Sequence, residues 1–162
     1  MTVSSSGQPF FFDDCIVGEE HLAGTYELSA ASMIEFAREW DPQPFHIDEV
    51  AARDSIFGDL TACSAHIFAI FCITSQRWQS GVVQQALAGL GFDDMRMHQP
   101  VFAGDVLRCK TVIAAARLSK SNPDSGIVSY DTRLENQNGV VVFSIRASSM
   151  LARDPARMAS KS

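Results

Sequence analysis

The chain has 162 residues, of which 46% are hydrophobic and 20% charged, and this composition is typical of one globular domain. Nineteen acidic and thirteen basic side chains give a formal net charge of −6, with no Lys/Arg cluster that could neutralise a phosphate backbone. These values exclude a disordered or fibrous chain and argue against a nucleic-acid partner.

The two ends of the chain differ in composition from the middle. Residues 1–9 are mostly small and polar, and residues 153–162 carry charges without apolar periodicity, so both are predicted to be flexible tails of a single domain at 10–152. Residues 1–7 lack Lys and Arg, and the apolar run Phe10–Phe12 is too short for the core of a secretory signal. We therefore expect a cytoplasmic protein.

The first regular elements are a strand and an amphipathic helix. Apolar and polar residues alternate over Gly24–Leu28, which predicts a short strand. After Ser29, the expected N-cap, apolar residues recur at helical spacing as far as Trp40. Pro42 must end this helix, and because a residue before proline avoids the helical region, Asp41 is expected at its very end.

The next segment predicts a turn and one short helix. Pro44 is expected to keep the following residues extended. A short helix is plausible from Asp48 or Glu49 to Asp54, and a loop through Gly58 follows.

A central helix and three long strands account for the rest. Residues 65–73 are apolar on all sides of a helix, but the run is far shorter than the roughly 20 residues needed to cross a bilayer, so its cover must come from protein. Residues 106–117, 127–134 and 140–151 alternate or are β-branched, like long strands, and Asn138-Gly139 is a hairpin signal. The sequence thus predicts an α+β protein with a curled antiparallel sheet wrapped around a long central helix.

The cysteines show no pattern of a metal site. They lack a Cys-x-x-Cys pair and a nearby set of His ligands, so we expect four reduced thiols and no metal. These residues are Cys15, Cys63, Cys72 and Cys109.

One carboxylate and one imidazole lie five residues apart after the first helix. In a continuous helix such positions point about 140° away from each other, so Asp41 and His46 could not share a substrate. The two prolines between them end the helix and favour a turn that brings both side chains to one small substrate cavity between Phe45 and Ile47. The alternative is a surface turn, in which Asp41 accepts local hydrogen bonds and His46 is solvated. Spacing alone favours the surface turn.

The residues around this pair resemble the MaoC-like dehydratase family. Residues 36–48 are similar to the family's helix end and catalytic overhang, where an Asp and a His five apart flank a proline-containing turn. Pro100–Leu107 resembles the family's Pro-Val-x-x-Gly-Asp-x-Leu turn, and residues 136–139 fall in its last hairpin. The resemblance extends over residues 10–152. Because members include the (R)-specific enoyl-CoA hydratases and adopt the hotdog fold, it implies a hotdog fold here.

The resemblance also implies a reaction and a set of site residues. It implies a hydro-lyase that adds water reversibly across the double bond of a 2-enoyl-CoA thioester to give a (3R)-hydroxyacyl-CoA. Asp41 and His46 would hold one water as the catalytic acid–base pair, and the N–H of Ser64, with Cys63, would face the thioester oxygen. Many members have glycine where this chain has Ser64, whose side chain narrows the approach. Coenzyme A is part of the substrate, so no separate cofactor is implied.

Two other functions stay open at this point. One is a hotdog acyl-CoA thioesterase, which would release the free thiol of CoA, and the other is a non-catalytic acyl-CoA binding domain. A single hotdog unit leaves sheet edges and one face uncovered, so we expect a homodimer or a dimer of dimers. Neither nucleic acid nor a membrane is an expected partner.

Overall fold

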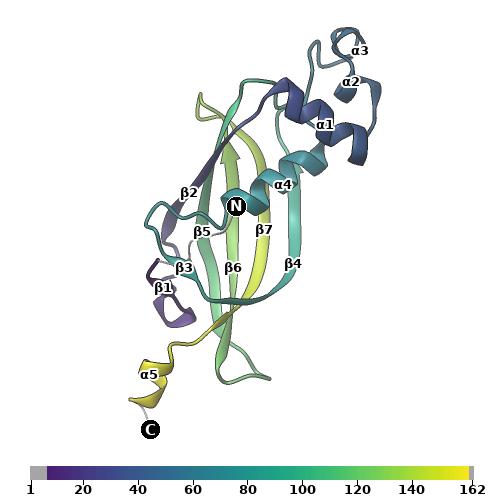
Figure 1. Ribbon diagram of the computed structural model, residues 1–162. Helices are drawn as coiled ribbons and strands as arrows, with labels where there is room; N and C mark the ends of the chain where they lie inside the picture. Colours follow the sequence, from purple (N-terminus) through teal and green to yellow (C-terminus); the bar gives the residue numbers. More distant parts are fainter. Residues whose placement is uncertain (1–6, 161–162) are drawn as a thin grey trace.

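A five-stranded antiparallel sheet, in the order β2-β5-β6-β7-β4, forms the body of the molecule and curls around helix α4 (Figure 1). The computed structural model describes residues 7–160. The strands of this sheet are β2 (Glu20–Glu27), β4 (Ala86–Met97), β5 (Val106–Leu118), β6 (Ser125–Glu135) and β7 (Val141–Ala152). The predicted α+β class, with a curled antiparallel sheet around a central helix, is confirmed.

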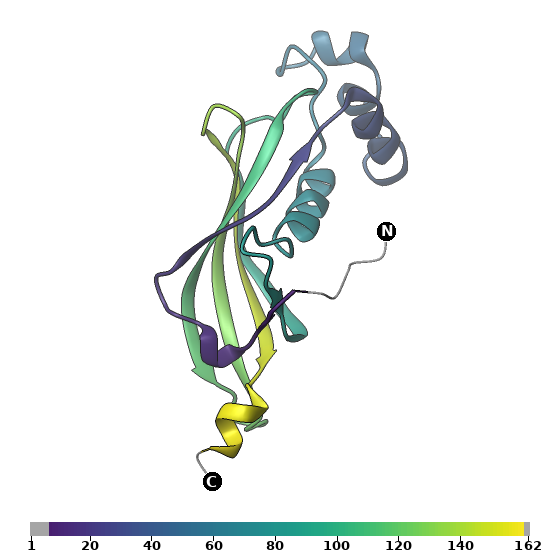
Figure 2. The same cartoon turned by 60° about the vertical axis from the view of Figure 1, so that its left-hand side comes forward.

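The helices fall into three groups along the length of the sheet. Helices α1, α2 and α3 form an overhang, residues 30–53, that projects from one end of the sheet, whereas α5 lies at the other end (Figure 2). A short parallel pair, β1 with β3, and the 3-10 helix η1 complete the fold. The bounds are α1 (Ala30–Trp40), α2 (Pro44–Ile47), α3 (Glu49–Arg53), α4 (Ser64–Thr74), α5 (Pro155–Ala159), β1 (Pro9–Phe10), β3 (Val83–Gln84) and η1 (Phe12–Asp14). No helix within residues 7–160 is long and apolar enough to cross a membrane.

The predicted limits of α1 agree with its local hydrogen bonds. The hydroxyl of Ser29 accepts the N–H of Ser32 at 3.2 Å, and the last helical bond runs from the N–H of Asp41 to the carbonyl of Ala37 at 2.9 Å. The backbone of Asp41 then leaves the helical region, with φ −158° and ψ 74°. The prediction of extended backbone after Pro44 is wrong: Pro44 begins the one-turn helix α2, because proline is well suited to a first helical position.

Helix α4 is covered by the sheet on one side only. Ile67, Ile70 and Phe71 are buried against the sheet, and the rings of Phe71 and Phe143 lie 5.8 Å apart. On the opposite side of α4, Ala65 and Ile73 are exposed. The apolar surface of this helix is therefore larger than the part that one chain covers.

Strand β4 was not predicted, and its position in the sheet explains why. It is an edge strand whose residues are all exposed, so no face of it is marked by buried side chains at every second position. Its pairing with β7 is also interrupted by register shifts. Exposed apolar side chains nevertheless gather along it, namely Leu87, Leu90, Phe92, Met95 and Met97.

The convex face of the sheet carries ion pairs. Arg133 on β6 contacts Glu20 on β2 and Glu135 on its own strand, each at 2.8 Å. One strand further along, the guanidinium of Arg146 binds both carboxylate oxygens of Asp131, at 2.7 and 2.8 Å. Among the described residues, most of the exposed large apolar side chains of the sheet lie along β4.

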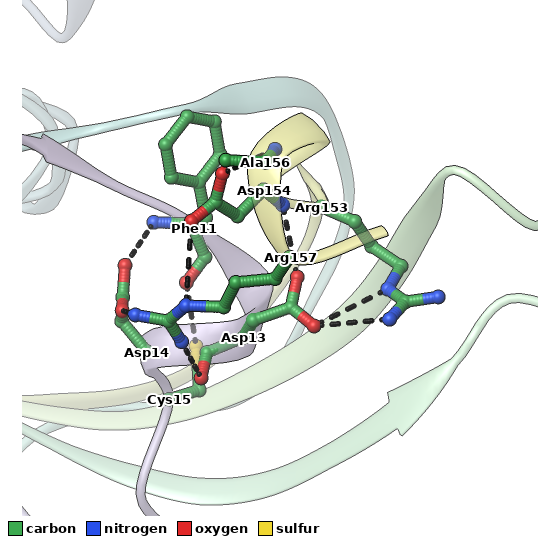
Figure 3. Close-up of polar contacts among 8 residues, drawn as sticks. All are labelled: Phe11, Asp13, Asp14, Cys15, Arg153, Asp154, Ala156 and Arg157. Atoms are coloured by element: carbon green, nitrogen blue, oxygen red, sulfur yellow. Dashed lines mark hydrogen bonds and ion pairs between the residues drawn. The ribbon is translucent and has the colours of Figure 1, made fainter. Parts of the chain in front are cut away.

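The C-terminal segment is tied to the start of the chain, which differs from the predicted flexible tail at residues 153–162. One carboxylate oxygen of Asp13 accepts hydrogen bonds from Arg153, and the other accepts the N–H of Asp154 (Figure 3). The guanidinium of Arg157 contacts Asp14 and donates to the carbonyl of Asp13. These contacts order α5 despite its lack of apolar periodicity. Residues 1–6, 161 and 162 of the predicted tails lie outside the described residues.

We expect Asp13→Asn to lower the free energy of unfolding by about 1–2 kcal/mol at pH 7, because it removes a charged acceptor with several donors. Burial alone would raise the pKa of Asp13, but the Asp154 N–H and the Arg153 guanidinium together hold this pKa below its ordinary value. A lowered pKa stabilises the fold above the unfolded-state pKa, and this stabilisation is lost as pH falls through the folded-state pKa.

Urea unfolding followed by circular dichroism should therefore show a difference between wild type and Asp13→Asn at pH 7 that shrinks below about pH 4. Asp54→Asn, which changes an exposed carboxylate at the end of α3, is the control and should leave stability almost unchanged. A difference between wild type and Asp13→Asn that grew in acid would contradict the stabilising role of the ionised carboxylate.

Candidate active site

The turn after α1 brings Asp41 and His46 together. The Oδ2 atom of Asp41 and the Nε2 atom of His46 lie 3.9 Å apart, too far for a direct hydrogen bond. The N–H of Gln43 donates to the carbonyl of Asp41 at 2.8 Å, and the N–H of His46 donates to the carbonyl of Gln43 at 2.9 Å. These two bonds and the prolines fold the chain back, so the side chains face each other despite their five-residue spacing.

A backbone carbonyl fixes the ring of His46. The Nδ1–H donates to the carbonyl of Thr61 at 2.7 Å, and the ring is buried, with its side chain 10% exposed. In the neutral ring this bond places the proton on Nδ1 and leaves the lone pair of Nε2 directed toward Asp41. Phe45 packs on the same ring, with centroids 4.4 Å apart. The imidazole of His46 is thus buried and fixed by a hydrogen bond, and it is not the solvated side chain of a surface turn.

The N-terminus of α4 supplies hydrogen-bond donors beside this pair. Cys63 is the N-cap, and its carbonyl accepts the N–H groups of His66 and Ile67 at 3.1 and 3.2 Å. Within residues 7–160, no carbonyl or side chain accepts the N–H of Ser64. Because the α4 dipole adds partial positive charge here, this N–H is suited to an oxygen that gains negative charge.

A pocket of about 350 Å³ joins His46 to the start of α4. His46 and Ser64 both line it, together with the segment that follows β4. Its other walls are largely apolar, which suits an acyl group with a polar reacting end. The residues that line it are His46, Phe57, Thr61, Ala62, Ser64, Ile67, Met97, His98, Gln99, Pro100 and Val101.

The other predicted site residues, Asp41 among them, do not line the pocket. Phe45 packs between the rings of His46 and Phe57. Cys63 is buried, and burial raises the pKa of its thiol, an effect to which the Asp41 carboxylate adds. The buried thiol is therefore less ready to form a thiolate nucleophile than an exposed one. Ile47 lies at the end of α2 next to His46 and is not among the lining residues.

Two features of the site were not found from sequence. The Thr61 carbonyl that holds His46 comes from fifteen residues away, and the wall at residues 97–101 belongs to another part of the fold. Only the resemblance to the family turn at residues 100–107 marked this second segment. His66, by contrast, stacks on Phe36 with centroids 4.4 Å apart, and burial lowers the pKa of its ring. It does not line the pocket and packs between α4 and α1.

Comparisons with known proteins identify the family and the fold of this chain. A family model described as FAS1-like, dehydratase domain region, matches residues 15–145. A crystal structure of a MaoC-like dehydratase from Rhodospirillum rubrum is 37% identical, covers 90% of this chain and 99% of that chain, and superposes with a TM-score of 0.82. A Mycobacterium tuberculosis protein with a double hotdog fold is 18% identical, with a TM-score of 0.77 over 91% of this chain and 45% of that one.

A curated relative is similar over a shorter stretch. Mesaconyl-CoA hydratase of Haloarcula marismortui is 36% identical over 69 residues, which are 41% of this chain and 19% of that protein. The match with this chain thus covers about a fifth of the length of that relative. The extent of the family match and the near-complete coverage of the Rhodospirillum structure show that this hotdog-fold chain belongs to the MaoC-like dehydratase family.

Proposed function

We propose that this protein is a hydratase that adds water reversibly across the double bond of a 2-enoyl-CoA thioester to give a (3R)-hydroxyacyl-CoA. The observation that carries the proposal is the facing of Asp41 and His46 beside a pocket that also reaches the N-terminus of α4. Acid–base groups and an N–H donor are the parts that hydration of an enoyl thioester requires. The family membership and the named hydratase relative support the same reaction class.

The geometry of the pair suits a water molecule as the nucleophile. Ionised Asp41 and the Nε2 of neutral His46 are both hydrogen-bond acceptors, and their 3.9 Å separation lets one water donate to both at about 2.8 Å each. A water that donates both protons to this pair, Asp41 and His46, hereafter the dyad, presents its oxygen lone pairs to the pocket. The dyad would therefore orient the nucleophile as well as deprotonate it.

The proposed reaction transfers one proton from water to the dyad and then from the dyad to C2. As the water oxygen bonds to C3, one O–H bond breaks and its proton passes to Asp41 or His46. The C2–C3 π electrons shift toward the thioester oxygen, whose negative charge the Ser64 N–H stabilises. C2 then takes the proton from the dyad, which returns to its starting state. Either member of the dyad is suited to the role of base.

An absorbance assay tests this function against its alternatives. A panel of crotonyl-CoA, a medium-chain enoyl-CoA and a branched dicarboxylic enoyl-CoA should lose the enoyl thioester absorbance with at least one substrate. A thiol reagent separates the thioesterase alternative, because hydration releases no free CoA. Binding without loss of absorbance for every member of the panel would instead favour the binding-domain alternative.

We expect Ser64→Gly to widen the range of acyl groups accepted without raising the thermal midpoint. Ser64 lines the pocket at the first turn of α4, and its removal opens space there while retaining the backbone N–H. The added backbone freedom works against stability. Relative kcat/KM values across the panel measure the effect, and unchanged selectivity would mean that this side chain does not meet the substrate.

A second copy of the chain is the partner that the surface favours. The exposed strand β4 ends the sheet with free backbone groups and a row of apolar side chains, and the exposed side of α4 adds Ala65 and Ile73. Edge strands of this kind pair readily with another strand. We propose a homodimer formed along β4, alone or as half of a dimer of dimers.

A further inference from the structure

The turn at residues 100–105 contains a buried carboxylate to which the proposed reaction assigns no part. Asp105 is only 8% exposed, and both of its carboxylate oxygens are engaged. Oδ2 accepts the N–H of Phe102 at 2.9 Å, and Oδ1 accepts the side-chain amide of Gln137 at 2.9 Å. The oxygen of the same Gln137 amide accepts the N–H of Val106 at 3.1 Å. The carboxylate thus joins the turn to the hairpin between β6 and β7.

The backbone around Asp105 is bound equally closely to the end of β2. The N–H of Leu28 donates to the carbonyl of Asp105 at 3.0 Å, and the N–H of Gly104 donates to the carbonyl of Leu28 at 2.7 Å. Gly104 has φ +89°, a left-handed conformation that glycine adopts without strain. The turn is therefore fixed on two sides, by β2 and by the Asp105 carboxylate.

The same turn also contacts residues 61 and 62, and the backbone of this segment binds His46. Phe102 forms a β-bridge with Thr61, and the N–H of Ala62 donates to the carbonyl of Val101 at 2.9 Å. The carbonyl of Thr61 in turn accepts the Nδ1–H of His46 at 2.7 Å. An unbroken series of short contacts therefore runs from the Asp105 carboxylate to the imidazole ring.

We propose that Asp105 is a positioning residue for His46, because its carboxylate fixes the turn that fixes the Thr61 carbonyl. This inference rests on the proposed hydratase function for its kinetic part only. Loss of the carboxylate would let Phe102 and Thr61 shift, and the bond to Nδ1 would lengthen. Nε2 would then lose its alignment with Asp41, and a small displacement of a catalytic group is costly in rate.

Asp105→Asn is the first test, because it preserves shape but leaves one donor without an acceptor. The amide oxygen can accept the N–H of Phe102, but the amide nitrogen then faces the donor side of Gln137. We expect kcat for the preferred enoyl-CoA to fall about 10- to 100-fold, with KM within about threefold of wild type. In NMR spectra of protein with isotopically labelled histidine, the Nδ1–H of His46 should exchange with water at least about tenfold faster.

Asp14→Asn is the matched control. The Asp14 carboxylate also accepts a backbone N–H three residues earlier at 2.9 Å, from Phe11, and its other oxygen is bound by a side chain, that of Arg157. It lies beside α5, at the opposite end of the molecule from the overhang (Figures 1 and 3). This variant should change neither kcat nor the His46 signal. The spectrum of His46→Gln assigns that signal among the four histidines.

A double variant provides a rescue that a general loss of stability would not allow. In Asp105→Asn combined with Gln137→Glu, the new amide donates to the new carboxylate, which also accepts the N–H of Val106. The three hydrogen bonds are restored with the charge moved to the hairpin. We expect kcat and the His46 exchange rate to return to within about threefold of wild type, since every donor again has an acceptor.

The outcomes separate this inference from the proposed function. If wild type hydrates none of the CoA thioesters, the hydratase proposal fails while the NMR comparison still decides the role of Asp105. If Asp105→Asn leaves both the His46 signal and kcat unchanged, the positioning role is refuted. The role is also refuted if kcat falls while the exchange rate of the His46 signal stays the same. Should Asp105→Asn not fold, Gln137→Ala, in the exposed hairpin, must accelerate exchange of the same signal, and an unchanged rate would refute the role.

Discussion

Asp41→Asn and His46→Gln are each expected to lower kcat for hydration of the preferred enoyl-CoA by about 10² to 10⁴, the range for loss of a positioned acid or base. Asn cannot accept the water proton as a carboxylate does, and Gln lacks the imidazole lone pair that the Thr61 carbonyl directs toward Asp41. Both changes are close to isosteric, so circular dichroism should match wild type. Asp54→Asn, which changes an exposed carboxylate directly after the overhang, should retain full activity.

The double variant Asp41→Asn with His46→Gln distinguishes a shared water from two independent roles. If both side chains hold the same water, the second substitution costs much less than the first, and the double variant resembles the slower single variant. Independent roles would multiply the two losses. Near wild-type turnover in either single variant, with an unchanged fold, would mean that residues 41–46 form only a structural turn.

The second prediction with a large expected effect concerns the assembly of two or four copies of the chain. Light scattering at micromolar concentration should give twice or four times the chain mass of 17.7 kDa. Replacing Leu87 and Leu90 together by Lys should shift the protein to a monomer, because two charges per copy would meet at the edge that β4 presents. Val50→Lys, at an equally exposed apolar residue on α3, is the control and should leave the mass unchanged. A wild-type monomer would refute the proposed dimer.

Local signals in the sequence predicted the parts of the fold that local physics determines. The Ser29 cap, the proline at residue 42 and the Asn138-Gly139 turn lie within a few residues of the structures that they specify, and all agree with the structure. Strand β4 escaped prediction because its sides differ little in burial within one chain. The order of α5 depends on ion pairs with Asp13, about 140 residues away, which no local pattern reveals.

The candidate site also has some features that the local sequence predicts and others that depend on distant segments. The pairing of Asp41 with His46 follows from the helix end and the prolines, all within one short segment. The Thr61 carbonyl is a backbone group, so the identity of residue 61 carries no sign of its bond to His46. Asp105 could be marked by its family turn, but its link to the imidazole depends on a β-bridge between distant segments.

The overhang also separates two kinds of evolutionary constraint. Its helices contact chiefly one another, and α1 also contacts α4, whereas strand register in the sheet is specified by alternating side chains of β5, β6 and β7. Substitutions in residues 30–53 can therefore change the surroundings of Asp41 and His46 without displacing a strand. Changes along the edge strand β4 can alter the proposed assembly without touching Asp41 or His46. The surroundings of the acid–base pair and the edge of the sheet can therefore be altered separately by mutation.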